Sequence, residues 1–142
     1  LVENVIKHNS ITSNKPMQIN IEIENLLTKT TKQKEYIDKF ISICQYINQH
    51  CTEDITLEQV AALAGFSKYH FSRLFKEFTN ISFYKYLNNH RMSYAEKLLL
   101  DPNINITEVA IHSGYNSISA FMRMFKIIKN CTPTEFRNMY QS

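Results

Sequence analysis

Residues 70–76 read HFSRLFK and residues 120–126 read AFMRMFK, so the pattern Phe-x-Arg-x-Phe-Lys occurs twice in the chain. The similarity extends to both sides of each copy. The equivalent pairs are Val60 and Val109, Ala61 and Ala110, Gly65 and Gly114, Phe66 and Tyr115, Asn80 and Asn130, and Ser82 and Thr132. Each copy predicts a short helix, a glycine turn with positive φ and a longer helix. This is the pattern of a helix-turn-helix unit, and two copies with matched flanks are far more specific than one.

The composition favours an all-α fold. Hydrophobic residues make up 44% of the 142 residues, while Gly (2) and Pro (3) are rare. We therefore expect helices with few tight turns around one compact core or two very small ones. No apolar run reaches the roughly 18 residues of a membrane span, and LVENVIKHNS at the start lacks the apolar stretch of a signal peptide. A cytoplasmic, nucleoid-associated protein is expected, and Leu1 in place of Met indicates a piece of a longer protein.

The cysteine and histidine residues give no sign of a metal site. Cys44, Cys51 and Cys131 are an odd number without close spacing, which indicates reduced thiols. A zinc site that uses Cys44, His50 and Cys51 fails on spacing, because there is no Cys-x2-Cys pair and His50 is adjacent to Cys51. Paired carboxylates, a Cys–His constellation and a phosphate-cradling glycine loop are also missing from the sequence. The sequence predicts no enzyme, no cofactor and no metal.

The beginning of the chain differs from the rest. Residues 1–35 are predicted to be a linker or the remnant of an upstream sensing or dimerisation domain, since residues 7–16 are turn-like and residues 28–35 are polar and charged. Residues 19–23 (INIEI) alternate with the period of a short strand. The same isoleucines, with the two leucines that follow, also suit one face of a helix.

Residues 36–142 are predicted to be a domain of helices. The first helix is expected to end near Gln49, with an apolar stripe of Ile37, Phe40, Ile41, Cys44 and Ile47. The later elements are a first helix-turn-helix unit at about 56–79, a linking helix at about 82–100, a second unit at about 105–130 and a last helix from Thr132-Pro133. Residues expected to cap helix N-termini are Thr56, Ser67, Ser82 and Asn116.

The longer helix of each unit is amphipathic. On a helical wheel the buried stripes are Phe71, Leu74, Phe75 and Phe78 in one unit and Phe121, Met124, Phe125 and Ile128 in the other. The opposite faces carry Tyr69, Ser72, Arg73 and Lys76, and Ser119, Met122, Arg123 and Lys126. Residues 67–76 and 116–130 contain no acidic residue, although solvated helix faces usually mix the two signs. The net charge of +3 is thus segregated onto two helices, as expected for an anionic partner.

The linking helix gives this duplication a purpose. It would be about 28 Å long at about 1.5 Å per residue, and successive major grooves on one face of B-DNA lie about 34 Å apart. Arg73 and Arg123 suit bidentate contacts to guanine, and Ile118 and Met122 suit thymine methyl groups. Candidates for base readout are Tyr69, Ser72, Arg73, Ser119, Ala120, Met122 and Arg123. Candidates for backbone contacts are Ser67, Lys68, Lys76, Ser117, Lys126 and Lys129.

These motifs resemble the C-terminal DNA-binding domain of the AraC/XylS family of bacterial transcription regulators. The resemblance covers about residues 37–140, through ITLEQVAALAGFSKYHFSRLFKEFTNISFYKYLNNHRMSYAEKLLL, ITEVAIHSGYNSISAFMRMFK and NCTPTEFR. It implies a seven-helix domain, binding to promoter DNA as an activator that contacts RNA polymerase, and a separate sensing or dimerising domain. This fragment is then expected to be monomeric. Tyr69, Ser72, Arg73, Ser119, Ala120 and Arg123 match the family's base-reading positions.

The sequence differs from the family pattern at two points, and it leaves one alternative function open. Asn80 and Asn130 stand where the family often has Gly, and Asn also adopts the left-handed conformation at a helix end. The second reading helix has few hydrogen-bonding side chains, so a role in holding the DNA backbone without reading bases stays open.

The alternative function is a helical protein–protein module that docks on RNA polymerase or a sensor domain without reading bases. The apolar Met122 and Ile127 on the second reading helix favour this alternative.

Overall fold

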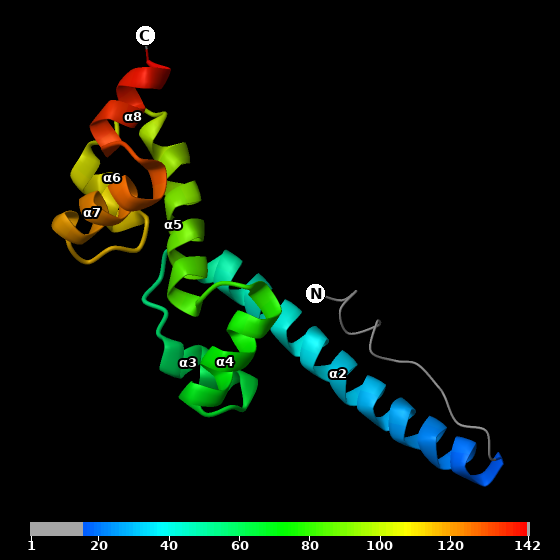
Figure 1. Cartoon of the computed structure of the whole chain (residues 1–142). Helices are drawn as coiled ribbons and strands as arrows, with labels where there is room; N and C mark the ends of the chain where they lie inside the picture. Colours follow the sequence, from blue (N-terminus) through cyan, green and yellow to red (C-terminus); the bar gives the residue numbers. More distant parts are fainter. Residues whose placement is uncertain (1–15, 142) are drawn as a thin grey trace.

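The computed structural model describes residues 16–141, and all of its regular elements are helices (Figure 1). The seven helices are α2 (Pro16–His50), α3 (Leu57–Ala64), α4 (Lys68–Thr79), α5 (Phe83–Leu99), α6 (Ile106–His112), α7 (Ile118–Lys129) and α8 (Pro133–Tyr140). The predicted all-α class and the two helix-turn-helix units, α3–α4 and α6–α7, are confirmed. None of the described helices is long and apolar enough to cross a membrane.

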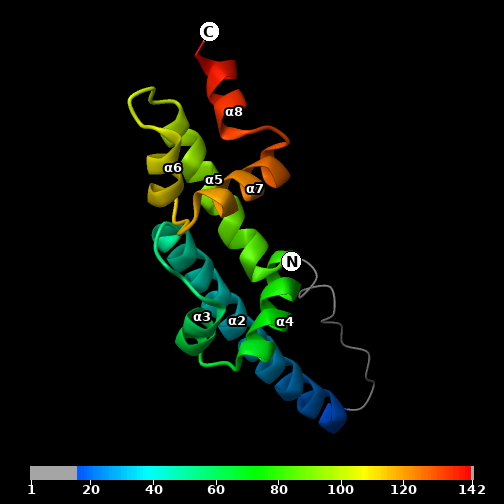
Figure 2. The same cartoon turned by 90° about the vertical axis from the view of Figure 1, so that its left-hand side faces the viewer.

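Helix α5 joins two small bodies (Figures 1 and 2). The first hydrophobic core contains buried side chains of α2, α3 and α4 together with Phe83 and Leu87 from the first half of α5. The second core contains Met92, Ala95 and Leu99 from the second half of α5, with buried side chains of α6 and α7 and the partly buried Phe136 of α8. The composition allowed either one compact core or two very small ones, and the structure has two small cores.

Side-chain caps fix where the helices begin. Thr56 and Thr132 each accept a hydrogen bond from the backbone N–H three residues later, and a Gln or Glu side chain accepts one from the cap's own N–H. Ser67 caps α4 as predicted. The prediction that Asn116 caps α7 is wrong, because Ser117 has the extended backbone of a cap and its hydroxyl accepts from Ala120 N at 3.2 Å. A cap of this kind stabilises a helix by about 1 kcal/mol.

The two units turn in the same way. Gly65 (φ 75°) and Gly114 (φ 98°) provide the positive φ between the short and the long helix of each unit. Asn80 (φ 68°) and Asn130 (φ 61°) end the long helices in the left-handed conformation that was expected of them. Asn tolerates this region better than other non-glycine residues, so the departure from the family pattern leaves the turn intact.

The described beginning of the chain is helical. Of the strand and the helix that the sequence allowed for residues 19–23, the structure has the helix, and residues 28–35 are helical too, because α2 is one continuous helix from Pro16 to His50. Proline suits the first helical turn, and no Gly or Pro follows it within α2. The turn-like residues 7–15 and the rest of 1–15 lie outside the described part of the chain. Whether this region is a linker or the remnant of an upstream domain stays a prediction.

The buried stripe of α2 is shifted from the predicted one. Phe40 and Ile47 are buried as expected, but Ile43 is buried (6% exposed) and Ile41 is 43% exposed. Ile43 lies three residues after Phe40 and four before Ile47, so it completes the same helical face. The sequence pattern allowed both isoleucines, and the position of α4 and α5 against α2 decides between them.

Candidate DNA-binding surface

The core-facing side of α4 anchors this helix by aromatic packing. Phe71 and Phe75 are fully buried, as predicted. The ring of Phe71 stacks on Phe40 of α2 at a centroid distance of 5.6 Å. The ring of Phe75 meets Phe83 of α5 edge-to-face at 5.9 Å. Rings from α2 and α5 therefore hold α4, and such pairs add about 0.5–1.5 kcal/mol beyond the area they bury.

The outer side of α4 presents the predicted polar residues to solvent. Tyr69 is 83% exposed, and Arg73 and Lys76 are also exposed. Ser72, which was expected to face outward, is half-buried. Tyr69 and Arg73 line a shallow surface hollow together with His70, a residue that the sequence reasoning missed. His70 also packs edge-on against Phe66 at 4.9 Å, so its ring supports the turn as well as the hollow.

The outer side of α7 is less polar than that of α4. Phe121 and Phe125 are fully buried, which matches their counterparts in α4. Ser119, Arg123 and Lys126 are exposed as predicted. Met122 is not: it is half-buried and packs against the second core, as does Ala120. Met122 directly follows Phe121 and lies about 100° from it on the helix, so an unbranched side chain there folds back onto the core.

Two of the predicted backbone-binding lysines already have carboxylate partners. Lys68 forms an ion pair with Glu58 of α3 at 3.0 Å, and this pairing raises the pKa of Lys68 and lowers that of Glu58. Lys129 forms an ion pair with Glu96 of α5. Exposed pairs of the first kind contribute little to stability and exchange readily for another anion. Lys76 and Lys126 are in none of the ion pairs found among the described residues.

Helix α5 lies between the two outer faces. It has 17 residues, which corresponds to about 26 Å at about 1.5 Å per residue. Helix α4 packs against its first part and α7 against its second part (Figure 2). Helices α4 and α7 are called the recognition helices below.

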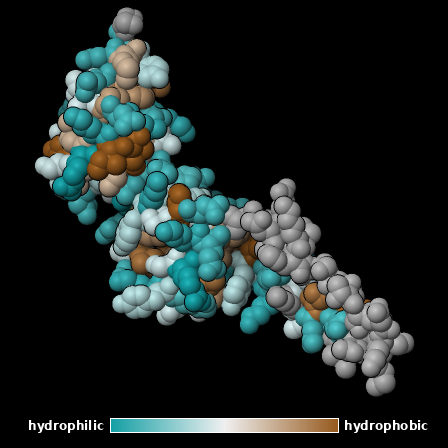
Figure 3. Space-filling model, viewed as in Figure 1, coloured by the Kyte–Doolittle hydropathy of each residue, from teal (hydrophilic) through white to brown (hydrophobic). Residues whose placement is uncertain are grey.

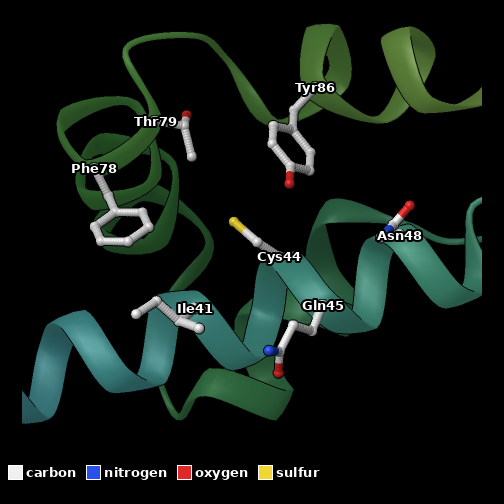
Figure 4. Close-up of a pocket in the computed structure, with 7 residues that line it drawn as sticks. All are labelled: Ile41, Cys44, Gln45, Asn48, Phe78, Thr79 and Tyr86. Atoms are coloured by element: carbon white, nitrogen blue, oxygen red, sulfur yellow. The ribbon is translucent and has the colours of Figure 1, made fainter. Parts of the chain in front are cut away.

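A groove between α2, α4 and α5 is lined by Ile41, Cys44, Gln45, Asn48, Phe78, Thr79 and Tyr86 (Figure 4). The hydroxyl of Tyr86 points toward the Cys44 thiol. Burial raises the pKa of Cys44 and raises the pKa of Tyr86 to about 12. Both groups are therefore protonated at neutral pH, and Cys44 is not an activated nucleophile. Among residues 16–141, no three His, Cys, Asp or Glu side chains are placed to hold a metal ion.

A family profile described as a helix-turn-helix domain matches residues 60–139. The chain is 29% identical over 144 residues to an uncharacterized HTH-type transcriptional regulator of Staphylococcus aureus strain COL, which covers 96% of this chain and 19% of that protein. It is 34% identical over 110 residues to the regulatory protein PocR of Salmonella typhimurium, which covers 77% of this chain and 36% of PocR. The chain thus spans about a fifth to about a third of the length of these relatives.

Solved structures share the arrangement. The C-terminal domain of AraT, a response regulator from Geobacillus stearothermophilus, superimposes with a TM-score of 0.68 at 33% identity over 71% of this chain and 84% of that one. The DNA-binding domain of the global transcriptional factor AdpA, solved with a target DNA, gives a TM-score of 0.68 at 25% identity over 72% and 92%. Together with the profile match, these likenesses place the chain among helix-turn-helix transcriptional regulators. The chain belongs to the AraC family of helix-turn-helix transcriptional regulators and carries the DNA-binding domain of that family.

Proposed function

We propose that this domain binds double-stranded DNA sequence-specifically, with α4 and α7 in successive major grooves on one face of the duplex. The observation that carries the proposal is the equivalence of the two recognition helices. Arg73 and Arg123 occupy matching exposed positions, Lys76 and Lys126 follow three residues later, and one helix holds both faces. AdpA, whose related domain was solved with a target DNA, supports binding to DNA.

The first unit is suited to polar base readout. Arg73 can donate two hydrogen bonds to guanine O6 and N7, the commonest specific contact in the major groove. Tyr69, which is 83% exposed, offers a hydroxyl and a flat ring beside it. Ser72 is half-buried, so it reaches only a base edge that comes close to the helix.

The second unit is suited to a different half-site. Arg123 and Ser119 are the exposed polar groups among its candidate base-reading residues, and Ile118 is 44% exposed next to the half-buried Ala120 and Met122. Apolar groups at these positions favour thymine methyl groups over amide-type hydrogen bonding. We therefore expect an asymmetric operator, with a half-site read through Arg73 and a more A·T-rich half-site under α7.

Contacts to phosphates position both helices. Ser67 and Ser117 begin the recognition helices, where free N–H groups attract anions. Lys76 and Lys126 are exposed and placed for phosphate contacts. Lys68 and Lys129 reach a phosphate only by releasing Glu58 and Glu96, so their contributions are smaller.

We propose the broader role by analogy with the family. The full protein is then an activator that contacts RNA polymerase in the cytoplasm, with a sensing or dimerising domain outside the present chain. Loss of promoter-driven transcription in a strain without the gene would support activation, and increased transcription would indicate a repressor.

Paired substitutions test the DNA-binding proposal. Arg73→Ala should cost about 1–3 kcal/mol of binding free energy and relax the base preference at one position. Lys76→Ala should weaken binding to all duplexes about equally and reduce the dependence on salt. Arg123→Ala and Lys126→Ala provide the same comparison in the second unit. Uniform loss of affinity in both Arg73→Ala and Lys76→Ala would contradict base readout by Arg73.

A docking module is the second candidate function, and one observation favours it. Hydrophobic side chains lie at the surface of the second unit (Figure 3), where Ile111 is 60% and Ile127 is 65% exposed. Ile127→Ser separates the two functions. It should leave DNA binding unchanged, because Ile127 is not among the proposed DNA-contacting residues, and it should weaken any association through this patch.

A further inference from the structure

The two cores meet near the middle of α5. Leu87 is the last residue of α5 in the first core, and Met92 is the first in the second core. Asn88 and Arg91 lie between them on the same helix and are half-buried. A single helix that joins two small bodies leaves them free to bend or twist against each other, unless other contacts lock the joint.

Arg91 connects the linking helix to the first body, the one built around the first core. Its Nε donates a hydrogen bond to the carbonyl oxygen of Cys51 at 2.7 Å, and its Nη2 donates to the carbonyl oxygen of Glu53 at 2.9 Å. Both carbonyls belong to the segment between α2 and α3, whose Cys51 side chain is part of the first core. Hydrogen bonds from a charged donor contribute more than neutral ones, and the guanidinium fork fixes their direction.

The same guanidinium contacts the second unit. It lies 5.4 Å from the centroid of the Tyr115 ring, and Tyr115 belongs to the second core. Burial raises the pKa of Tyr115 to about 12, so its hydroxyl stays protonated and donates to Asn88 Oδ1 at 2.5 Å. Arg91 is thus held between the loop that joins α2 to α3 in the first body and an aromatic ring of the second body.

The turn of the second unit also approaches the first body directly, at the segment between α2 and α3. A Cβ atom on Gly114 would lie 2.9 Å from Cys51 O, 3.1 Å from Thr52 Cα and 2.9 Å from Arg91 Nε. Two of these three atoms are backbone and cannot move aside as a flexible side chain can. The equivalent Gly65 in the first unit has nothing within 4 Å of the same position. The close approach therefore belongs to the joint and not to the helix-turn-helix motif.

We propose that Arg91, Gly114, Tyr115 and Asn88 form a junction that fixes the separation and orientation of the two recognition helices before DNA is bound. Arg91 is its central positioning residue, although it contacts no DNA. The inference rests on the proposed function for its consequence on DNA, but the rigidity of the junction is a property of the free protein. A preset spacing removes the cost of ordering the two units on binding. It also makes the domain selective for the number of base pairs between half-sites.

Arg137 offers a matched control. Its Nε donates to Leu99 O at 2.9 Å, and its Nη2 donates to Asp101 O at 3.1 Å and to Ile104 O at 2.5 Å. This arginine holds the loop between α5 and α6 in the way that Arg91 holds the loop between α2 and α3. All of its partners lie within the second body or at the end of α5, so Arg137→Met removes similar bonds without loosening the junction.

The first experiment measures residual dipolar couplings of the isotope-labelled 142-residue chain without DNA. Couplings from α3–α4 and from α6–α7 should fit one alignment tensor in the wild type and in Arg137→Met. They should require two tensors in Arg91→Met, with each unit's internal couplings still consistent with its own fold. Two tensors in the wild type would overturn the proposal, and so would one tensor in a folded Arg91→Met variant. The wild-type result decides even if a variant fails to fold.

The second experiment uses duplexes with both half-sites one helical turn apart or displaced by about half a turn, and a duplex with one half-site. Wild type and Arg137→Met should prefer the first spacing, whereas Arg91→Met should lose about tenfold or more of that preference. Arg91→Met should bind the single half-site like the wild type. Unchanged spacing preference in Arg91→Met would overturn the proposal. If the wild type binds no duplex, the proposed function fails, while the dipolar couplings still decide the question of the junction.

Discussion

Alanine substitutions at the two turn glycines should have unequal costs. Both glycines have positive φ, so alanine at either site meets the left-handed penalty of about 1–2 kcal/mol. Alanine also lowers the conformational entropy of the unfolded chain, which offsets about 0.4–1 kcal/mol of this penalty. Gly65→Ala, whose new methyl group meets nothing within 4 Å, should therefore lower the free energy of unfolding by only about 1 kcal/mol.

Gly114→Ala has a further cost. Its methyl group would lie 2.9 Å from Cys51 O, well inside the 3.5–4.0 Å at which such atoms pack well. Overpacking of this kind costs about 1–3 kcal/mol, so the total loss should be about 2–4 kcal/mol. Urea denaturation followed by circular dichroism gives both values, and amide hydrogen exchange shows which helices open. Equal losses for the two variants would refute the tight contact at Gly114.

Three further outcomes are expected. Phe75→Ala should lower the free energy of unfolding by about 3–5 kcal/mol, since the ring is fully buried among three helices, and a thermal melt of the variant checks this. Thr132→Ala should cost about 1 kcal/mol through loss of the α8 capping box, and hydrogen exchange should show it as increased opening of α8 alone. Burial lowers the pKa of His90 below its ordinary value of 6.5, so the folded state disfavours the imidazolium. Its contribution to stability should be complete above about pH 6.5 and decline as the pH falls toward the folded pKa, a slope that His90→Gln should reduce in urea titrations at several pH values.

The duplicated pattern made most of the domain predictable. Helix caps, turn glycines and the spacing of the Phe residues are local patterns, set within a few residues of one another. They can therefore be read from one sequence without knowledge of the tertiary packing. Two features of α2 could not be predicted in this way. Period-two and helical patterns coincide in residues 19–23, and Ile41 and Ile43 are equally apolar, so tertiary packing makes the choice.

The candidate surface was predicted less completely than the fold. The exposure of Tyr69 and Arg73 followed from the helical wheel, but the inward turn of Met122 did not, because the wheel ignores the length and flexibility of a side chain. The pair between Lys129 and Glu96 joins two helices that no local pattern relates. The junction at Arg91 is of the same kind, since its carbonyl partners are about forty residues away in the chain.

Selection of this chain's binding sites from a random duplex pool tests the central claim most directly. The selection is done at near-physiological salt, because affinity for phosphates alone rises steeply as salt falls. The account predicts a motif of two unlike half-sites with centres about one helical turn apart, the one under α7 being richer in A·T. No enriched motif, together with no salt-sensitive binding to any duplex, would contradict DNA recognition and leave the docking module as the function of this domain.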